Sequence, residues 1–250
     1  MNKIEKMRNG WNEWAQKFNN PLSAVGRPLR KNELEGVVED IAIKLDLTKD
    51  DRLLDVGCGS GAFLSLLINK VKSVSGVDIS NKMIEFARVT VKGGKFFVSQ
   101  TDNLPFEDNS FDKIICYSVF HYFPDENYAM RTINELLRVC KPGGSIIIGD
   151  IPSKKHFEEI LTPMKKFLRI IKIRLKQLIR KIKGESVKKG IHEVYYIHKP
   201  KNWMFYNLDF LYKSIESQGY PSKVLKQNNN RQWNTITNNY RFDILIEKII

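Results

Sequence analysis

The stretch that decides the fold is Leu53-Leu54-Asp55-Val56-Gly57-Cys58-Gly59-Ser60-Gly61. Its first four residues are typical of the end of a buried strand, and the spacing of apolar residues over 62–69 predicts a helix. Three glycines at alternate positions predict a tight turn between the two, because glycine tolerates positive φ and lets a ligand approach the backbone. A strand, a glycine-rich turn and a helix together form the nucleotide-side crevice of an open α/β sheet.

The spacing of the glycines narrows the choice of ligand for this turn. It is G-x-G-x-G, whereas the dinucleotide fingerprint is G-x-G-x-x-G. This difference favours S-adenosylmethionine, which has no phosphate, over a nicotinamide dinucleotide. A nicotinamide-dependent oxidoreductase is the competing enzyme hypothesis. A membrane- or RNA-binding protein with a non-catalytic version of the fold is the third.

Further apolar runs end in polar residues. The run 74–78 ends in Asp78, whose carboxylate can accept hydrogen bonds from both hydroxyls of a ribose. The run 95–99 leads to Asp102, a candidate acceptor for an exocyclic amine such as that of adenine. More strands are expected over 110–118 and, after a turn at Lys141-Pro142-Gly143-Gly144, over 145–149. Helices are expected over 32–45, 81–89, 128–139 and 205–218, and two closing strands over 221–227 and 241–248.

With the motifs D-V-G-C-G-S-G, V-D-I-S, D-N-L-P-F-x-D-x-S-F-D and L-L-R-V-x-K-P-G-G in this order, the chain resembles a known family. The family is the class I, Rossmann-like S-adenosylmethionine-dependent methyltransferases, in the branch that carries small-molecule methyltransferases. The resemblance is close over 52–150 and looser over 205–249. It implies an α/β fold with a mostly parallel seven-stranded sheet, an antiparallel edge hairpin and an α-helical lid insertion after the fifth strand.

The resemblance also implies S-adenosyl-L-methionine as the cofactor, and a set of residues that bind it. The three glycines would shape the cofactor loop with the support of Asp55, and Asp78 would bind the ribose. Asp102 and Asn103 would recognise the adenine. The full set that we expect to bind the cofactor is Asp55, Gly57, Cys58, Gly59, Gly61, Asp78, Ile79, Met83, Asp102, Asn103 and Ser118.

Length and composition agree with one domain of 250 residues. We divide it into an N-terminal helical cap (1–45), a cofactor-binding core (46–151), a basic helical lid insertion (152–203) and a C-terminal helix with the closing strands (204–250). The cap carries a stripe of Trp11, Trp14, Ala15 and Phe18 that we expect to be mostly core.

Cysteine and histidine usage predicts a cytoplasmic protein without a metal. Three cysteines and no C-x-x-C pair indicate reduced thiols, and the four histidines show no ligand spacing. No run approaches the length of a membrane span, and the polar start is no secretory signal. The oligomeric state is left open.

Positive charge gathers in the insertion. The segment 154–189 has 13 Lys or Arg against 3 Glu, so it carries ten of the chain's thirteen net positive charges. Apolar residues recur there at steps of three and four, which predicts an amphipathic helix over 157–183 with one basic face. Three interpretations follow. It is a lid over the acceptor site, a lid that also lies on anionic lipid at the inner membrane surface, or an RNA contact, which is the least favoured.

The segment after the fourth strand bears on the chemistry. Methyl transfer is an in-line displacement, and an oxygen acceptor also needs a base. His121 is the candidate general base, because histidine ordinarily titrates near neutral pH. The alternative is that His121 only orients the loop. His192, Tyr195, Tyr196 and His198 are candidates to line an acceptor pocket, or else part of a plain strand.

The same segment argues against nucleic-acid acceptors. Tyr117-Ser118-Val119-Phe120 lacks the Asn- or Asp-Pro-Pro-aromatic motif common in amino-methyltransferases of bases. None of the three cysteines follows a proline, as a C5-pyrimidine enzyme requires. We therefore expect O-methylation of a small-molecule or lipid-linked acceptor such as a sugar.

Overall fold

A computed structural model of the chain describes residues 2–17, 31–156, 175, 204–226 and 241–249. The strands are β1 (Arg52–Val56), β2 (Ser73–Asp78), β3 (Lys95–Val98), β4 (Phe111–Tyr117), β5 (Cys140–Pro152), β6 (Ser222–Lys226) and β7 (Arg241–Glu247). The helices are α1 (Lys3–Gln16), α2 (Lys31–Leu45), α3 (Ala62–Leu67), α4 (Asn81–Thr90), the 3₁₀ turn η2 (Phe120–Tyr122), α5 (Glu126–Val139) and α9 (Leu208–Glu216).

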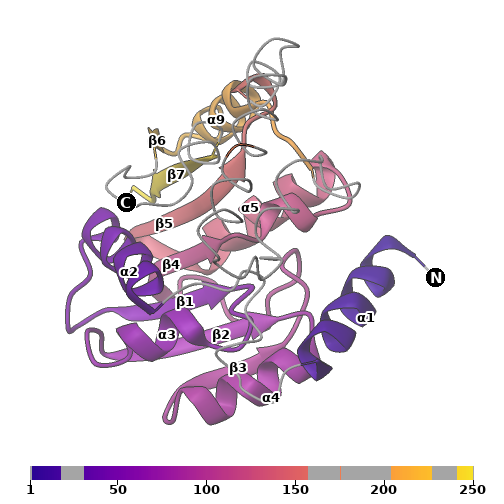
Figure 1. Cartoon of the computed structure of the whole chain (residues 1–250). Helices are drawn as coiled ribbons and strands as arrows, with labels where there is room; N and C mark the ends of the chain where they lie inside the picture. The colour runs from indigo at the N-terminus through magenta and orange to yellow at the C-terminus, as the bar shows by residue number, and fades with distance from the viewer. Residues whose placement is uncertain (1, 18–30, 157–174, 176–203, 227–240, 250) are drawn as a thin grey trace.

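The seven strands form one sheet in the order β3-β2-β1-β4-β5-β7-β6. The first five in this order are parallel, whereas β7 runs antiparallel to β5 and β6 antiparallel to β7. The antiparallel strands and α9 lie at one end of the molecule, and β3 and α4 lie at the other (Figure 1). The predicted fold class, with its antiparallel edge hairpin, is confirmed.

Neighbouring residues of the central strands pack against different helices. Leu54 and Ile114 join α5 and α9 in one core cluster, and Leu53 and Ile115 join α2, α3 and α4 in the other. All four side chains are fully buried. Because helices cover both faces of the sheet, the parallel strands are apolar on both sides, and their carboxyl ends carry the polar residues.

The predicted turn at 141–144 is wrong as the start of the fifth strand. β5 already begins at Cys140, which pairs with Phe111, and the next pairing joins Ser145 to Lys113. The residues between them form an irregularity within the strand, with Gly143 at φ 77°. A Pro-Gly-Gly segment normally indicates a break, but pairing with β4 holds the backbone on both sides of it in one strand.

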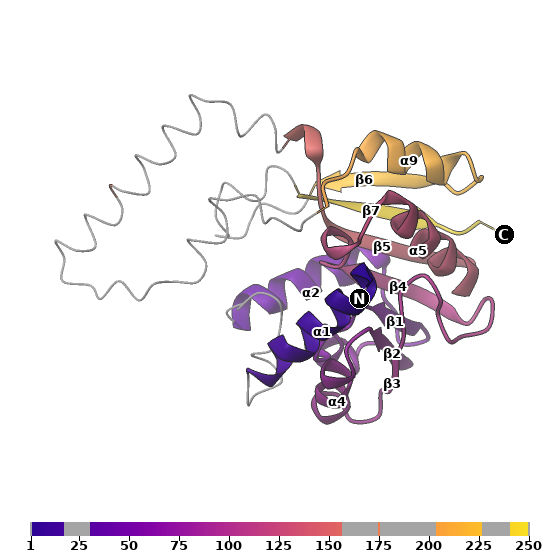
Figure 2. The same cartoon turned by 90° about the vertical axis from the view of Figure 1, so that its right-hand side faces the viewer.

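Helix α1 lies beside α4, as Figure 2 shows, and reaches the segment after β4. Asn12 Oδ1 accepts a hydrogen bond from Ser80 Oγ at 2.7 Å, and the Trp11 ring meets the Tyr122 ring edge-on with centroids 5.0 Å apart. Ala15 is fully buried against Met83, with Trp11 and Trp14 partly buried around them. The predicted apolar stripe therefore packs as core; Phe18, its fourth member, lies outside the described residues.

Part of the interpretation of the insertion also falls outside the described residues. This applies to the basic amphipathic helix over 157–183 and to His192, Tyr195, Tyr196 and His198. Within the described ranges, every helix is too short or too polar to cross a membrane.

Candidate functional site

The glycine-rich turn lies where the order of the sheet reverses. β1 pairs with β2 on one side and β4 on the other, so the chain leaves β1 in one direction and β4 in the opposite one. In open α/β sheets, ligands bind outside the carboxyl ends of the strands at such a point. All the residues that we expect to bind the cofactor lie at or after the carboxyl ends of β1, β2, β3 and β4.

The turn after β1 is held close to two neighbouring segments. Gly57, Gly59 and Gly61 have φ angles of 80°, 52° and 79°. The N–H groups of Gly57 and Cys58 both donate to the carbonyl oxygen of Val77, at 2.8 and 2.9 Å. A Cβ on Gly57 would lie 2.4 Å from Cγ2 of Val119. Position 57 therefore needs glycine both for its backbone conformation and for the close approach of the segment after β4.

Asp78 ends β2 and faces the turn. Its Oδ2 accepts the N–H of Gly59 at 3.0 Å, and its Oδ1 accepts the N–H of Ser80 at 2.9 Å. Burial raises the pKa of Asp78 to about 6, although these backbone donors lower it. A carboxylate offers about four lone-pair sites, so each oxygen retains a site for a further donor.

Asp55, in β1, is a second buried carboxyl group beside the same turn. Burial, and then the negative charge of Asp78, raise the pKa of Asp55 to about 7. The same causes raise the pKa of the Cys58 thiol, which therefore remains protonated near neutral pH. Among the described residues, no cation pairs with Asp55 or Asp78, so the turn is a region of uncompensated negative charge.

Ile79 and Met83, two apolar members of the expected cofactor-binding set, are both buried. Ile79 directly follows Asp78, and Met83 packs against Ala15 of α1. Ser80, between them, caps α4: its hydroxyl accepts the N–H of Met83 at 3.1 Å. Helix α1 therefore covers part of the surface that we expect the cofactor to use.

The loop after β3 carries Asp102 and Asn103. Asp102 Oδ2 accepts a hydrogen bond from Arg131 Nε of α5 at 3.0 Å, a partner that the sequence analysis did not foresee. Asn103 is exposed, and its carbonyl oxygen accepts a hydrogen bond from the Ser99 hydroxyl at 2.6 Å. The side chain of Asn103 is thus the more accessible of the two for a ligand.

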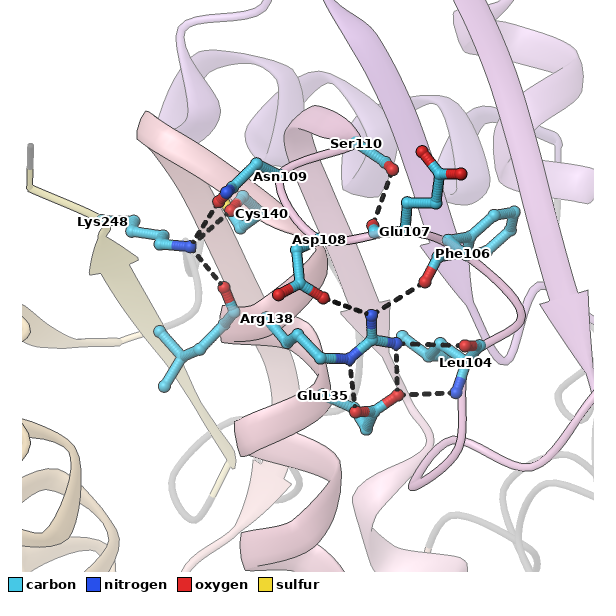
Figure 3. A network of polar contacts seen from close by, with 11 residues as sticks. Leu104, Phe106, Glu107, Asp108, Asn109, Ser110, Glu135, Arg138, Cys140 and Lys248 are labelled. Carbon is cyan, nitrogen blue, oxygen red and sulfur yellow. Dashed lines mark hydrogen bonds and ion pairs between the residues drawn. The ribbon is translucent and has the colours of Figure 1, made fainter.

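The continuation of this loop is anchored by Arg138 of α5 (Figure 3). Its guanidinium donates to the carbonyl oxygens of Leu104 and Phe106, at 3.1 and 2.8 Å. It also pairs with Asp108 at 2.8 Å and with Glu135 at 2.7 Å. Glu135 in turn accepts the N–H of Leu104 at 2.7 Å. One arginine therefore fixes the backbone just beyond Asp102 and Asn103.

The carboxyl ends of β4 and β5 are joined by a hydrogen bond from the Ser118 hydroxyl to Asp150 Oδ2. Both residues have left-handed backbone conformations, with φ of 61° and 62°. Asp150 lies in a bulge of β5, because Ile148 pairs with Ile244 and Ile151 with Phe242. Each non-glycine residue in this conformation costs about 1–2 kcal/mol. Bulges next to active sites commonly redirect a side chain.

His121, in the segment after β4, is buried, with 1% of its surface exposed. Its Nδ1 lies 3.5 Å from Nη1 of Arg241 in β7. Nη1 also forms an ion pair with Asp150 Oδ2 at 3.0 Å and donates to the Asp150 carbonyl oxygen at 2.8 Å. The predicted role of His121 as a general base stays a prediction, and the arginine beside it bears on that role.

Four residues of this network were missed by the sequence analysis: Asp150, Arg241, Asp243 and Lys44. Asp243 Oδ1 accepts the N–H of Asp150 at 3.0 Å, and its Oδ2 pairs with Lys44 Nζ at 2.6 Å. Burial lowers the pKa of Lys44, but Asp243 and Asp40 more than offset this and raise it. A signal was present, because Arg241 and Asp243 are charged residues on one face of a strand whose other residues up to Ile246 are apolar.

Comparison with known proteins bears on the identity of this site. Residues 54–148 match the methyltransferase domain family. The methyltransferase GfsG of Streptomyces halstedii is 31% identical over 135 residues, which are 51% of this chain and 48% of that protein. The probable tRNA methyltransferase 9B of Bos taurus is 35% identical over 121 residues, 46% of this chain and 26% of that protein. The chain thus spans about half or less of the length of these curated relatives.

The similarity in fold to known methyltransferases extends beyond residues 54–148. The crystal structure of magnesium protoporphyrin IX methyltransferase from Synechocystis PCC 6803 with bound S-adenosylhomocysteine is 16% identical and has a TM-score of 0.60. It covers 99% of this chain and 100% of that one, and at this identity it shows the fold alone. Residues 54–148 are therefore a methyltransferase domain, in a chain with the fold of the class I, Rossmann-like family that uses S-adenosylmethionine.

Proposed function

We propose that the chain transfers a methyl group from S-adenosylmethionine to an oxygen of a small-molecule or lipid-linked acceptor. The observation that carries the proposal is the pair of carboxyl groups, Asp55 and Asp78, at the turn 57–61. S-adenosylmethionine brings a sulfonium and an ammonium, and negative charge nearby attracts both. The pyrophosphate of a nicotinamide dinucleotide would bring like charges to the same place, which argues against the oxidoreductase alternative.

The residues present fit this cofactor. Each oxygen of Asp78 accepts one backbone N–H and retains a lone pair for a ribose hydroxyl. The space beside Gly59 is open, because a Cβ there would meet no atom within 4 Å. Backbone and ligand can therefore approach closely at this position, as a phosphate-free nucleoside requires.

When bound, S-adenosylmethionine supplies an electrophilic methyl group. The task of the chain is then to hold the acceptor oxygen in line with it and to exclude water, which accounts for much of the rate enhancement in such displacements. The segment after β4, with Ser118 and His121, lies at the carboxyl end of the sheet next to the turn 57–61. We propose that this segment contacts the acceptor.

Calorimetry of the full chain with S-adenosylmethionine, S-adenosylhomocysteine and NAD tests the cofactor. We expect both S-adenosyl compounds to bind and NAD to show no heat of binding. Binding of NAD alone would overturn the proposal in favour of an oxidoreductase. Binding of none of the three would favour a non-catalytic protein.

For the insertion 152–203 we propose a lid whose basic face lies on anionic lipid, as its sequence indicates. Each basic residue near such a surface is worth about 1 kcal/mol, and the attraction is screened over about 8 Å at physiological salt. Co-sedimentation with phosphatidylserine liposomes should therefore occur at low salt and fade at high salt. The matched variant replaces six basic residues by Gln, namely Lys165, Lys166, Arg169, Lys172, Arg180 and Lys181.

A second candidate for the basic face is RNA, and the similarity to a probable tRNA methyltransferase favours it. Phosphate contacts would make RNA binding fall steeply as salt rises. A gel-shift titration with tRNA beside the liposome assay separates the two. Binding of RNA in place of liposomes would replace the membrane proposal, and binding of neither would leave a simple lid.

A further inference from the structure

Arg241 connects two groups at the acceptor side of the sheet. Its Nη1 lies 3.0 Å from Asp150 Oδ2 and 3.5 Å from Nδ1 of His121. Arg241 and Asp150 are each 2% exposed, and His121 is 1% exposed. Because β7 runs antiparallel to β5, the first residue of β7 lies opposite Pro152, at the same edge as the carboxyl ends of the parallel strands.

The contact restricts the protonation of the imidazole. A guanidinium has five N–H donors and no acceptor, so its hydrogen bond to Nδ1 requires a free lone pair on that nitrogen. Neutral histidine carries its single proton on the other nitrogen, Nε2. A doubly protonated ring would place a second positive charge beside Arg241, and Asp150 balances only one.

Charged side chains from two strands lie near the ring. Arg241 comes from β7 and Asp150 from β5, and the Tyr122 ring, on the element of His121 itself, has its centroid 4.1 Å from that of His121. Lys44 and Asp243 form their own ion pair at 2.6 Å. The charges of Arg241 and Asp150 therefore cancel beside a neutral ring, whereas a charged ring would add a positive charge that this pair does not balance.

The backbone around these groups is held in place. The N–H of Met204 donates to the carbonyl oxygen of His121 at 2.9 Å, and the Tyr206 hydroxyl donates to that of Phe120 at 2.8 Å. On the other side, the bulge and the left-handed conformation at Asp150 place its carboxylate against Arg241. Strain of this kind persists only where the surroundings determine the conformation.

We propose that Arg241 is a positioning residue that keeps His121 neutral, with its proton on Nε2. This inference rests on the proposed methyl transfer. The tautomer makes His121 an N–H donor that orients the acceptor oxygen, in place of the general base that the sequence suggests. The acceptor's proton would then pass to a water molecule.

The experiment is nitrogen NMR of the full chain labelled with ¹⁵N-histidine, near neutral pH. The variant His121→Gln assigns the two ring signals of His121 by their loss. In the native chain we expect a protonated Nε2 and an unprotonated Nδ1, as two well-separated signals. Arg241→Lys, which retains a charged donor, should preserve this pattern.

Removing the arginine alone would leave Asp150 buried without its cation, and the chain risks unfolding. The double variant Asp150→Asn with Arg241→Met removes both charges. In it we expect the two His121 signals to move toward each other as both tautomers become populated. His156, whose Nδ1 lies 2.9 Å from Ser153 Oγ, is the internal control and should retain its pattern.

A proton on Nδ1 of His121 in the native chain, a doubly protonated ring, or an unchanged tautomer in the folded double variant would each overturn the proposal. Neither cofactor nor acceptor is present in this experiment. Its failure therefore leaves the proposed methyl transfer standing, and failure of the calorimetry leaves the assigned tautomer standing.

Discussion

The two halves of the candidate site differ in whether their buried carboxyl groups are paired with cations. Around the turn 57–61, Asp78 accepts hydrogen bonds from backbone N–H groups, and among the described residues no cation pairs with Asp55 or Asp78. The pKa of Asp55 rises to about 7 and that of Asp78 to about 6. At the ends of β4 and β5, by contrast, Asp150 and Asp243 are paired with Arg241 and Lys44. The first half has uncompensated negative charge, and the second is neutralised within the protein.

This difference indicates what each half is built for. Buried carboxyl groups without a cation are costly, so their presence indicates a site that a cationic ligand completes. Buried ion pairs contribute little net stability but hold side chains in one arrangement. The half at β1 and β2 is thus suited to bind the charged cofactor. The half at β4, β5 and β7 is suited to hold groups against an acceptor.

The largest expected effect is on turnover, from a change in the neutralised half. His121→Ala should lower kcat by about 10²–10⁴-fold, because one positioned acid–base or hydrogen-bonding group is lost. Affinity for S-adenosylmethionine should stay within about twofold, since His121 lies outside the charged half. Turnover is measured with an acceptor found by screening, and affinity by calorimetry. Normal turnover would show that His121 only supports the loop.

In the charged half, Asp78→Ala should weaken S-adenosylmethionine binding by about 1.5–3 kcal/mol, or about 10- to 150-fold. Asp78→Asn keeps one acceptor oxygen and should lose less. Because only the carboxylate accepts from both ribose hydroxyls, the native affinity should also fall as pH drops below about 6. The Asn variant should lack this pH dependence. Native-like affinity of Asp78→Ala for S-adenosylmethionine would contradict the assignment of Asp78 to the ribose.

The charged half should also destabilise the free protein at high pH. The pKa of Asp55 is raised from 3.8 to about 7 by folding, so the folded state holds a proton that the unfolded state has lost. Its contribution to stability is full below pH 4 and is lost as pH rises through 7. The free energy of unfolding of Asp55→Asn, measured relative to that of the native chain, should therefore increase by about 1–3 kcal/mol between pH 5 and pH 8. Urea denaturation at both pH values measures this, and a gain at pH 5 alone would contradict it.

The smallest effect is expected from the network in Figure 3. Arg138→Met should lower the free energy of unfolding by about 1–2 kcal/mol, a figure discounted for the partial exposure of its ion pairs. It should also weaken cofactor binding a few-fold, because the loop after Asn103 loses its hydrogen bonds to Arg138. Lys248→Met is the matched control. It removes donors to Asn109, Leu137 and Cys140, on the far side of the network. It should destabilise similarly and leave cofactor affinity unchanged; equal losses of affinity would show a purely global effect.

The charged half was largely predictable because its signals are local in the chain. The turn, Asp78 and Ser80 lie within about one strand–helix–strand unit, where glycine spacing and polar residues at strand ends are diagnostic. The hairpin of β6 and β7 followed from apolar runs in the same way. The predicted strand break at 141–144 failed because a pairing with Phe111, distant in sequence, overrides the local preference of Pro-Gly-Gly.

By itself, then, the sequence determined the order of strands and helices, the glycine turn and the carboxyl groups beside it, since short-range patterns encode them. Only the tertiary structure decided that Arg241 meets Asp150 across 91 residues and that Lys44 meets Asp243 across 199. Such pairs depend on which strands become neighbours and on where a bulge shifts the register. No local pattern carries that information, because the sheet brings together side chains from its separate strands only when it closes.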